Sequence, residues 1–413
     1  MKIKVATLYS ALFSIILLAQ LYIPSFKVNM LLQLLTLTFF IFSGNGRISI
    51  RFLKRIIPLF ILFSIPFFVM FFYNYQTGNI IKDISYFIKP IVGITLGYMF
   101  FKKINNFQIF LKAIILSGLI SASIHFVLLL FFTNVLSGSV SQIREFGKDN
   151  FLELFALLLL WFSDAFSQLP LFSKKRKRQI LILLLISYFF YLSRTMFVVG
   201  IIMILAVKGY TIITARTLKI MVSLVLGILI LYGYLFSVKI NRNATGIDGF
   251  LYKLKIAPGE IFITKIDREN HKDLWDHWRA YEASRAIALM DDNPSSYFLG
   301  TGYGSQINLR FHSPLGGTKK GLKFISEIHN GYVFVFYKTG LIGIIAYLFF
   351  LIGLYKTNYY QKDYSSHLIS AIGLFYLFSS LTITGIFNKR DVLILILGAL
   401  LFFNYEKKKE LSR

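Results

Sequence analysis

The sequence EIHNGYVFVFY at residues 327–337 lies at the boundary between the two kinds of sequence in this chain. It ends the only long polar segment, which runs from about Ile240 to Asn330, and an apolar run begins at Val333. On both sides of the polar segment, long apolar runs alternate with short loops. A histidine and an asparagine therefore stand where a loop enters a predicted membrane helix, which is a natural place for a functional site.

The composition is that of a membrane protein. The chain has 413 residues, of which 56% are hydrophobic and 15% are charged, whereas a soluble domain has about 25% charged residues. The formal net charge of +26 comes from short Lys and Arg clusters between apolar runs. This pattern indicates membrane topology and argues against nucleic-acid binding. The absence of cysteine excludes disulfides, thiolate metal sites and a cysteine nucleophile.

A helix needs about 20 apolar residues to cross the hydrocarbon core of a membrane. The predicted membrane helices are 5–23, 28–43, 56–73, 84–101, 109–133, 151–171, 180–192, 196–207, 220–238, 331–355, 367–387 and 392–404. Basic loops face the cytoplasm by the positive-inside rule, which places the polar segment outside and both termini inside. The turn Lys389-Arg390 is one exception to this rule, because it falls on the outer side.

These segments predict an all-α polytopic membrane protein with about twelve transmembrane helices and one long extracytoplasmic loop that contains short helices. The predicted parts are an N-terminal bundle at 1–238, an extracytoplasmic loop at 239–330, and C-terminal helices with a cytoplasmic tail at 331–413. Within the loop, the three- and four-residue spacing of apolar side chains predicts one amphipathic helix from His271 to Asp292, suited to the membrane surface.

The apolar stretch 180–207 is interrupted only by Ser193-Arg194-Thr195, and both of its flanks are basic. Two cytoplasmic flanks require a hairpin, in which each arm reaches only about 20 Å into a core of about 30 Å. Arg194 is therefore expected at membrane depth. A buried guanidinium costs several kcal/mol unless an anion or backbone carbonyls partner it. A phosphate could be that partner, and hydrogen bonds to carbonyls of the turn are the structural alternative.

The segment from Arg279 to Gly343 resembles the bacterial O-antigen polymerase and ligase family of membrane glycosyltransferases. The elements that carry the resemblance are Arg279, Pro294, Gly300-Thr301-Gly302-Tyr303-Gly304, His329-Asn330 and Gly340-Leu341-Ile342-Gly343. Upstream, Tyr191-Leu192-Ser193-Arg194-Thr195 resembles the family's Ser-Arg element, and Arg144-Glu145-Phe146-Gly147 resembles an arginine motif of an outward loop. Lys338 departs from the pattern, because an acidic residue is common at its place.

The resemblance implies an enzyme of the bacterial cytoplasmic (inner) membrane with its site on the extracytoplasmic face. It implies undecaprenyl-diphosphate-linked oligosaccharides as donor and acceptor, membrane lipid around them, and a chain-length regulator as a further partner. The implied reaction moves a glycan to an acceptor hydroxyl with inversion, and it uses neither a cofactor nor a metal.

The candidate site residues follow from this chemistry. Guanidinium groups can stabilise a departing diphosphate, which assigns Arg144, Arg194 and Arg279 to diphosphate binding. A neutral imidazole can accept the proton of an acceptor hydroxyl, which makes His329 the candidate base beside Arg279. Glu327 either orients His329 or faces water. We expect loop-shaping by Gly300, Gly302, Gly304 and Asn330, because glycine adopts positive φ at no steric cost.

Three functions remain open at this point. A polymerase would add a growing lipid-linked glycan to the next repeat unit, and a ligase of the same family would move the finished glycan to lipid A core. Both need the same donor chemistry. A lipid-linked glycan transporter belongs to another class and predicts inverted repeats with interrupted helices in two halves. The single long polar segment in the second half of this chain disfavours the transporter.

Overall fold

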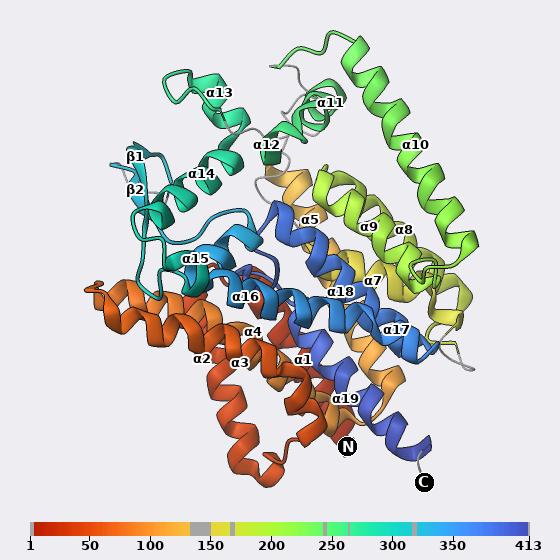
Figure 1. The fold of residues 1–413 in the computed structure, drawn as a ribbon. Helices are drawn as coiled ribbons and strands as arrows, with labels where there is room; N and C mark the ends of the chain where they lie inside the picture. Colours follow the sequence, from red (N-terminus) through yellow and green to blue (C-terminus); the bar gives the residue numbers. More distant parts are fainter. Residues whose placement is uncertain are drawn as a thin grey trace.

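The computed structural model describes residues 4–132, 150–165, 170–242, 246–262, 265–315 and 320–411. A helix lies at each of the predicted membrane segments. These helices are α1 (Val5–Tyr22), α2 (Phe26–Phe40), α3 (Ile50–Val69), α4 (Thr77–Ile104), α5 (Phe107–Phe132), α7 (Phe151–Trp161), α8 (Lys174–Phe190), α9 (Arg194–Val207), α10 (Ala215–Ser237), α16 (Gly331–Tyr355), α18 (Tyr364–Thr382) and α19 (Leu393–Leu411). They form one bundle, and both chain ends lie on its side opposite to the polar segment (Figure 1).

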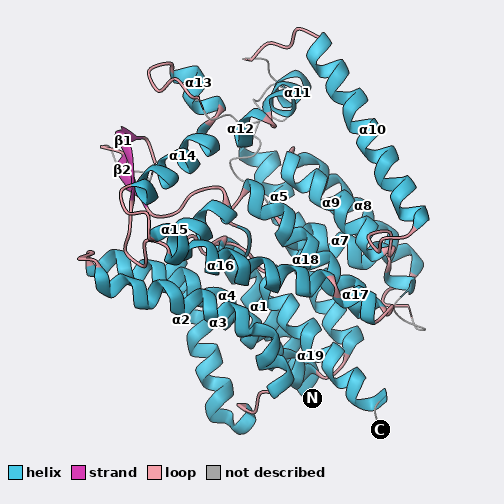
Figure 2. Ribbon diagram, viewed as in Figure 1, coloured by secondary structure: helices cyan, strands magenta, loops and turns pink. Residues whose placement is uncertain are grey.

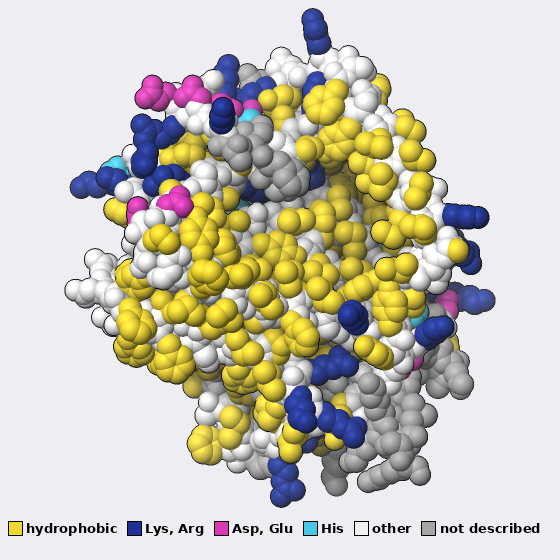
Figure 3. Space-filling model, viewed as in Figure 1, with side chains coloured by type: hydrophobic (Ala, Val, Ile, Leu, Met, Phe, Trp, Pro, Cys, Tyr) yellow, Lys and Arg dark blue, Asp and Glu magenta, His cyan; other side chains and the backbone are white. Residues whose placement is uncertain are grey.

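By length and composition, 8 helical segments of the described residues are able to cross a membrane. The shorter apolar helices are α7, α9 and the Leu393–Tyr405 part of α19. Figure 3 shows hydrophobic side chains across the middle of one face, with most Lys and Arg side chains toward its upper left and lower right. The protein is therefore a polytopic membrane protein, while the number of twelve crossings stays a prediction.

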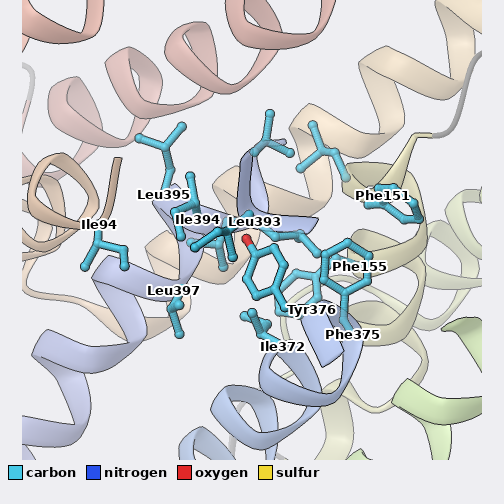
Figure 4. Close-up of a cluster of buried hydrophobic side chains, with 14 of the residues drawn as sticks. Ile94, Phe151, Phe155, Ile372, Phe375, Tyr376, Leu393, Ile394, Leu395 and Leu397 are labelled. Carbon is cyan, nitrogen blue, oxygen red and sulfur yellow. The ribbon is translucent and has the colours of Figure 1, made fainter. Parts of the chain in front are cut away.

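The centre of the bundle is α4, which packs against α1, α2, α3 and α19. A side chain at Gly97 would overlap the backbone of Leu395, and one at Gly398 would overlap the backbone of Ile94. Small residues at such positions let two membrane helices approach closely. Figure 4 shows the neighbouring core, where Phe155, Tyr376 and other side chains of α7, α18 and α19 come together. The predicted parts 1–238 and 331–413 thus share one core, and their division stays a prediction.

Helix α10 stands away from the rest of the bundle (Figure 1). In an apolar stretch of 18 residues of this helix, only 6% of the residues are buried. The large apolar side chains of Leu229 and Ile230 are exposed. An exposed apolar face of this extent marks a surface that contacts lipid or another apolar partner. The helix leads from the α8–α9 hairpin to the polar segment.

The polar segment contains helices and a strand pair. Its elements are α11 (Gly246–Ile256), α12 (Gly259–Phe262), α13 (His271–Asp276), α14 (Trp278–Asp291), α15 (Ser296–Leu299), β1 (Ile307–Ser313) and β2 (Leu322–Ile325). Figure 2 shows the strands beside α14. They pair antiparallel, with Ile307 opposite Ile325. The short helices predicted for this segment are present, but the strand pair makes the all-α prediction wrong here, because strands this short have little local signal.

The prediction of a single helix from His271 to Asp292 was also wrong. His277 has φ −119° and ψ 26°, which separates α13 from α14. In α14, the side chains of Trp278, Glu282 and Met290 are buried, and the helix packs on β1 and α16. Its apolar face is therefore covered by protein rather than by the membrane surface.

Helix α16 is broken at Gly340, which has φ 65° and ψ −166°. The glycine turn lies against this break. The amides of Thr301 and Gly302 donate to the carbonyls of Tyr337 and Lys338, over 2.7 and 3.2 Å. A helix end leaves its last carbonyls without partners in the helix. The turn supplies those partners, and it thereby fixes the first half of α16.

A buried ion pair locks the same junction. Lys338 Nζ lies 2.5 Å from Asp83 Oδ2, and both side chains are fully buried. Lys338 also donates to the carbonyl of Ser305 at 2.7 Å, and the amide of Gly304 donates to Asp83 at 2.8 Å. Lys338 stands where an acidic residue is common in the family. Its counterion is Asp83 on α4. The pair joins α4, the glycine turn and α16.

We expect Lys338→Ala and Asp83→Ala each to destabilise the protein by about 3–5 kcal/mol, because each leaves one buried charge without its partner. The double variant should be less destabilised than the sum of the single variants. Thermal unfolding in detergent measures both effects. The pair Lys177–Asp164, 2.9 Å apart with the Asp164 side chain 81% exposed, is the control, and Asp164→Ala should change stability little. Additive effects of Lys338→Ala and Asp83→Ala would contradict the coupling.

Candidate functional site

A cavity of about 410 Å³ lies where the polar segment meets the α8–α9 hairpin and the start of α16. Its lining residues are Arg194, Arg242, Tyr252, Lys253, Ile256, Glu260, Trp275, Asp276, Trp278, Arg279 and His329. Three predicted site residues, Arg194, Arg279 and His329, are therefore brought together. The predicted site residue Arg144 lies outside the described residues.

Arg194 is the first residue of α9, directly after the turn of the hairpin. Ser193 caps the helix by accepting a hydrogen bond from the amide of Met196 at 3.3 Å, and Leu192 has φ 45°. The Arg194 side chain is 18% exposed and reaches out of the hairpin toward α11 and α12. It donates to the carbonyl of Lys253. Its guanidinium is thus held by groups of the polar segment and not by carbonyls of its own turn.

Glu260 on α12 joins the two arginines. Arg194 Nη2 lies 2.9 Å from Glu260 Oε1, and Arg279 Nη1 contacts Glu260 Oε2. The carboxylate, whose side chain is 11% exposed, thus bridges guanidinium groups from α9 and α14. Two guanidinium forks around one anion form a geometry that suits carboxylate or phosphate. Sequence reasoning missed Glu260, because no motif or helical spacing links it to either arginine.

A second ion pair lies on the wall of the cavity. Arg242 binds Asp276 with two nitrogens, at 2.9 Å each, and Tyr252 donates to Asp276 at 3.0 Å. Hydrogen bonding to Asp276 raises the pKa of Arg242, and burial, together with Asp276, raises the pKa of Tyr252. Among the lining residues, Arg194, Arg242, Lys253 and Arg279 outnumber Glu260 and Asp276. The cavity therefore has an excess of positive charge.

His329 is held by Glu282 of α14. One carboxylate oxygen, Glu282 Oε2, accepts from the His329 amide and lies within hydrogen-bond distance of His329 Nδ1, at 2.9 Å in both cases. Glu282 is buried, while 48% of the His329 side chain is exposed. Because a carboxylate can only accept here, Nδ1 carries the proton in the neutral ring. The other nitrogen, Nε2, is then able to accept a proton.

Glu327, for which orienting His329 and facing water were both left open, has other partners. Glu327 Oε2 accepts from Tyr86 at 3.0 Å and lies 2.7 Å from Lys389 Nζ. The orienting carboxylate is Glu282, which sequence reasoning missed. The spacing from Arg279 to Glu282 could have pointed to Glu282 as a site residue, since residues three apart lie on the same face of a helix. Glu327 lines a different pocket, together with His329.

The loop-shaping candidates lie at the two ends of the first half of α16. Asn330 is the N-cap of α16, and its side chain accepts from the amides of Tyr332 and Val333 at 3.1 and 3.2 Å. This cap leaves His329 directly before the helix. Gly300, Gly302 and Gly304 have φ of 78°, 79° and 93°, which favours glycine over other residues. A side chain at Gly300 would also overlap the backbone at Lys338.

His125 makes a hydrogen-bond contact inside the bundle, away from the cavity. His125 Nδ1 lies 2.8 Å from Ser187 Oγ, and Ser187 donates to the buried Glu153 at 2.6 Å. In the part of the chain that the structure describes, no group of three His, Asp or Glu side chains is placed to hold a metal ion. A metal-independent reaction stays a prediction.

The fold is that of a polytopic membrane protein, and the cavity at the polar end of its bundle has an excess of positive charge. Residues 179–348 match the family model described as O-antigen ligase, so the chain carries a domain of the O-antigen ligase family. This match confirms the resemblance, and members of that family are membrane glycosyltransferase-like enzymes. The matched segment includes Arg194, Arg279 and His329. No curated protein matches the chain.

We expect Glu282→Ala to reduce glycan transfer at least about tenfold, because it releases both the ring and the amide of His329. The rate of glycan transfer by purified protein measures this effect, and the main change should be in kcat. Glu282→Gln should retain part of the activity, since an amide oxygen can still accept one hydrogen bond. Equal activity of wild type and Glu282→Ala would show that His329 needs no orienting partner.

Proposed function

We propose that this protein polymerises undecaprenyl-diphosphate-linked oligosaccharide repeat units into a surface polysaccharide, of O-antigen or capsule type. The transfer would take place with inversion on the outer side of the cytoplasmic membrane. One observation carries the proposal: Arg194, Arg279 and His329 are far apart in the sequence and line one cavity. A cationic group for the leaving diphosphate and a base for the acceptor are the two parts that this reaction needs.

The arginines would bind the donor diphosphate. The Glu260 carboxylate lies between the guanidinium groups of Arg194 and Arg279. A phosphate group has the same preference for two-pronged hydrogen bonds, so the diphosphate would take the place of this carboxylate. As the bond between the sugar and the diphosphate breaks, charge grows on the diphosphate, and fixed guanidinium groups stabilise it.

His329 would act as the base. The acceptor hydroxyl oxygen attacks the anomeric carbon from the face opposite to the diphosphate, and its proton moves to His329 Nε2. The new glycosidic bond forms as the bond to the diphosphate oxygen breaks, and the lipid diphosphate leaves as an anion. The contact from Glu282 to Nδ1, 2.9 Å long, would stabilise the positive charge that the ring gains. The donor, the acceptor hydroxyl and the His329 ring account for every bond and proton in this step.

We expect Arg194→Ala and His329→Ala each to abolish product formation, because the first removes a diphosphate ligand and the second removes the base. Arg194→Lys should also fail, since an ammonium lacks the planar fork of a guanidinium. The measurement is elongation of a defined diphosphate-linked repeat unit by the purified protein. Arg310→Ala is the matched control, because Arg310 lies in β1 and does not line the cavity.

Unchanged elongation by one of these variants, folded in the membrane as wild type, would remove that residue from the reaction. Absence of longer glycans with wild-type protein would reject the polymerase itself.

A ligase is the second candidate, because the matched family model is described as O-antigen ligase. A ligase would use the same cavity and transfer the finished glycan to lipid A core. A deletion strain separates the two functions. If the protein is a polymerase, the ladder of chain lengths should disappear while single repeats remain attached to the acceptor. Accumulation of full-length lipid-linked polymer would instead identify the ligase.

A further inference from the structure

A second pocket, of about 400 Å³, shares His329 with the cavity of the two arginines. It lies between the first turns of α4, strand β2, the loop before α16 and the turn before α19. The lining residues that matter here are Lys82, Glu282, Phe324, Glu327, Asn388 and Lys389. The imidazole of His329 and its orienting carboxylate thus lie at the boundary between two pockets.

The two pockets differ in their chemistry. Cations outnumber anions in the first, as a diphosphate requires. In the second, Lys82 and Lys389 are balanced by Glu282 and Glu327, and Asn388 adds both a donor and an acceptor. Apolar side chains of β2, including the exposed Phe324, line the same pocket. A saccharide presents hydroxyl groups at its ring edges and carbon-bound hydrogens on its faces, so this mixture suits a sugar ring better than an isolated anion.

The turn that carries Asn388 and Lys389 is held in place by buried side chains. Lys89 of α4 is fully buried and donates to the carbonyl of Asn388. Gln20 of α1 is also buried and donates to the carbonyl of Lys389 at 2.6 Å. A buried lysine is costly unless its ammonium has a partner. The hydrogen bonds from Lys89 and Gln20 satisfy these two buried side chains and fix the backbone of the turn.

The side chain of Lys389 is held as well. Its Nζ lies 2.7 Å from Glu327 Oε2 and 5.6 Å from the centre of the Tyr86 ring. Tyr86 donates to the same Glu327 oxygen at 3.0 Å. Three segments, α4, the loop before α16 and the turn before α19, therefore fix one ammonium and one carboxylate at the pocket wall. Such fixed polar groups are the specific contacts of a preformed ligand site.

We infer that this second pocket binds the acceptor saccharide and presents its hydroxyl to His329, while the donor diphosphate occupies the first cavity. The inference rests on the proposed function and adds to it the place where the saccharide part of the second substrate binds. It also accounts for the Lys389-Arg390 turn, which violates the positive-inside rule. If Lys389 binds the acceptor, its function on the outer side outweighs the tendency of basic residues to face the cytoplasm.

The test uses full-length protein in lipid nanodiscs with a lipid-linked donor. The acceptor probe is the repeat-unit oligosaccharide released from its lipid by mild acid, so that it has no diphosphate. Lys82→Ala and Phe324→Ala change exposed side chains, so they leave the fold intact. Each should raise the KM for the oligosaccharide about tenfold, the effect of one lost hydrogen bond or apolar contact, with the donor KM unchanged within about twofold.

Arg242→Ala in the first cavity is the matched variant and should raise the donor KM alone. An unchanged acceptor KM in both Lys82→Ala and Phe324→Ala, or an equal rise of the donor KM, would overturn the inference. If wild-type protein forms no product, the proposed function fails, and calorimetric binding of the oligosaccharide still tests the pocket. Binding that both variants weaken supports a saccharide site, and binding that both retain overturns it.

Discussion

The buried pair of Lys338 and Asp83 is the interaction on which the rest of the arrangement depends. An unpaired charge inside a membrane bundle costs several kcal/mol, so the two helices that carry these side chains must meet. Their meeting fixes the break in α16 and docks the glycine turn on it. The first half of α16 begins directly after His329. The position of the imidazole therefore follows from an ion pair that has no direct contact with it.

The cost of leaving a buried charge unpaired also determines the arrangement of side chains in the cavity. Arg194 and Arg279 come from distant segments, and the one carboxylate of Glu260 satisfies both. His329 is fixed through its ring and its amide by Glu282, which is itself buried. Charges that would be costly in isolation thus become a preorganised set of donors and acceptors. Preorganisation of this kind is what lets a site stabilise charge that develops in a reaction.

Hydropathy predicted a helix at each apolar segment, and the charge pattern with the family resemblance indicated that Arg194, Arg279 and His329 would come together. Other features needed tertiary information. Lys338, Thr339 and Gly340 interrupt the apolar run of α16, but their presence in a membrane helix does not by itself set φ, so the value of 65° at Gly340 could not be predicted. The strands β1 and β2 form because β1 packs on α14. Glu260 and Asp83 have no local motif, and Arg144 lies outside the described residues.

The central claim is that the two arginines and the imidazole act on one substrate. A cryo-EM structure with a non-cleavable phosphonate analogue of the lipid-linked donor tests it most directly. The account predicts phosphorus-bound oxygens within about 3 Å of the Arg194 and Arg279 guanidinium nitrogens, the Glu260 carboxylate displaced from between them, and the first sugar beside His329. A diphosphate bound elsewhere, with Glu260 still between the arginines, would contradict it.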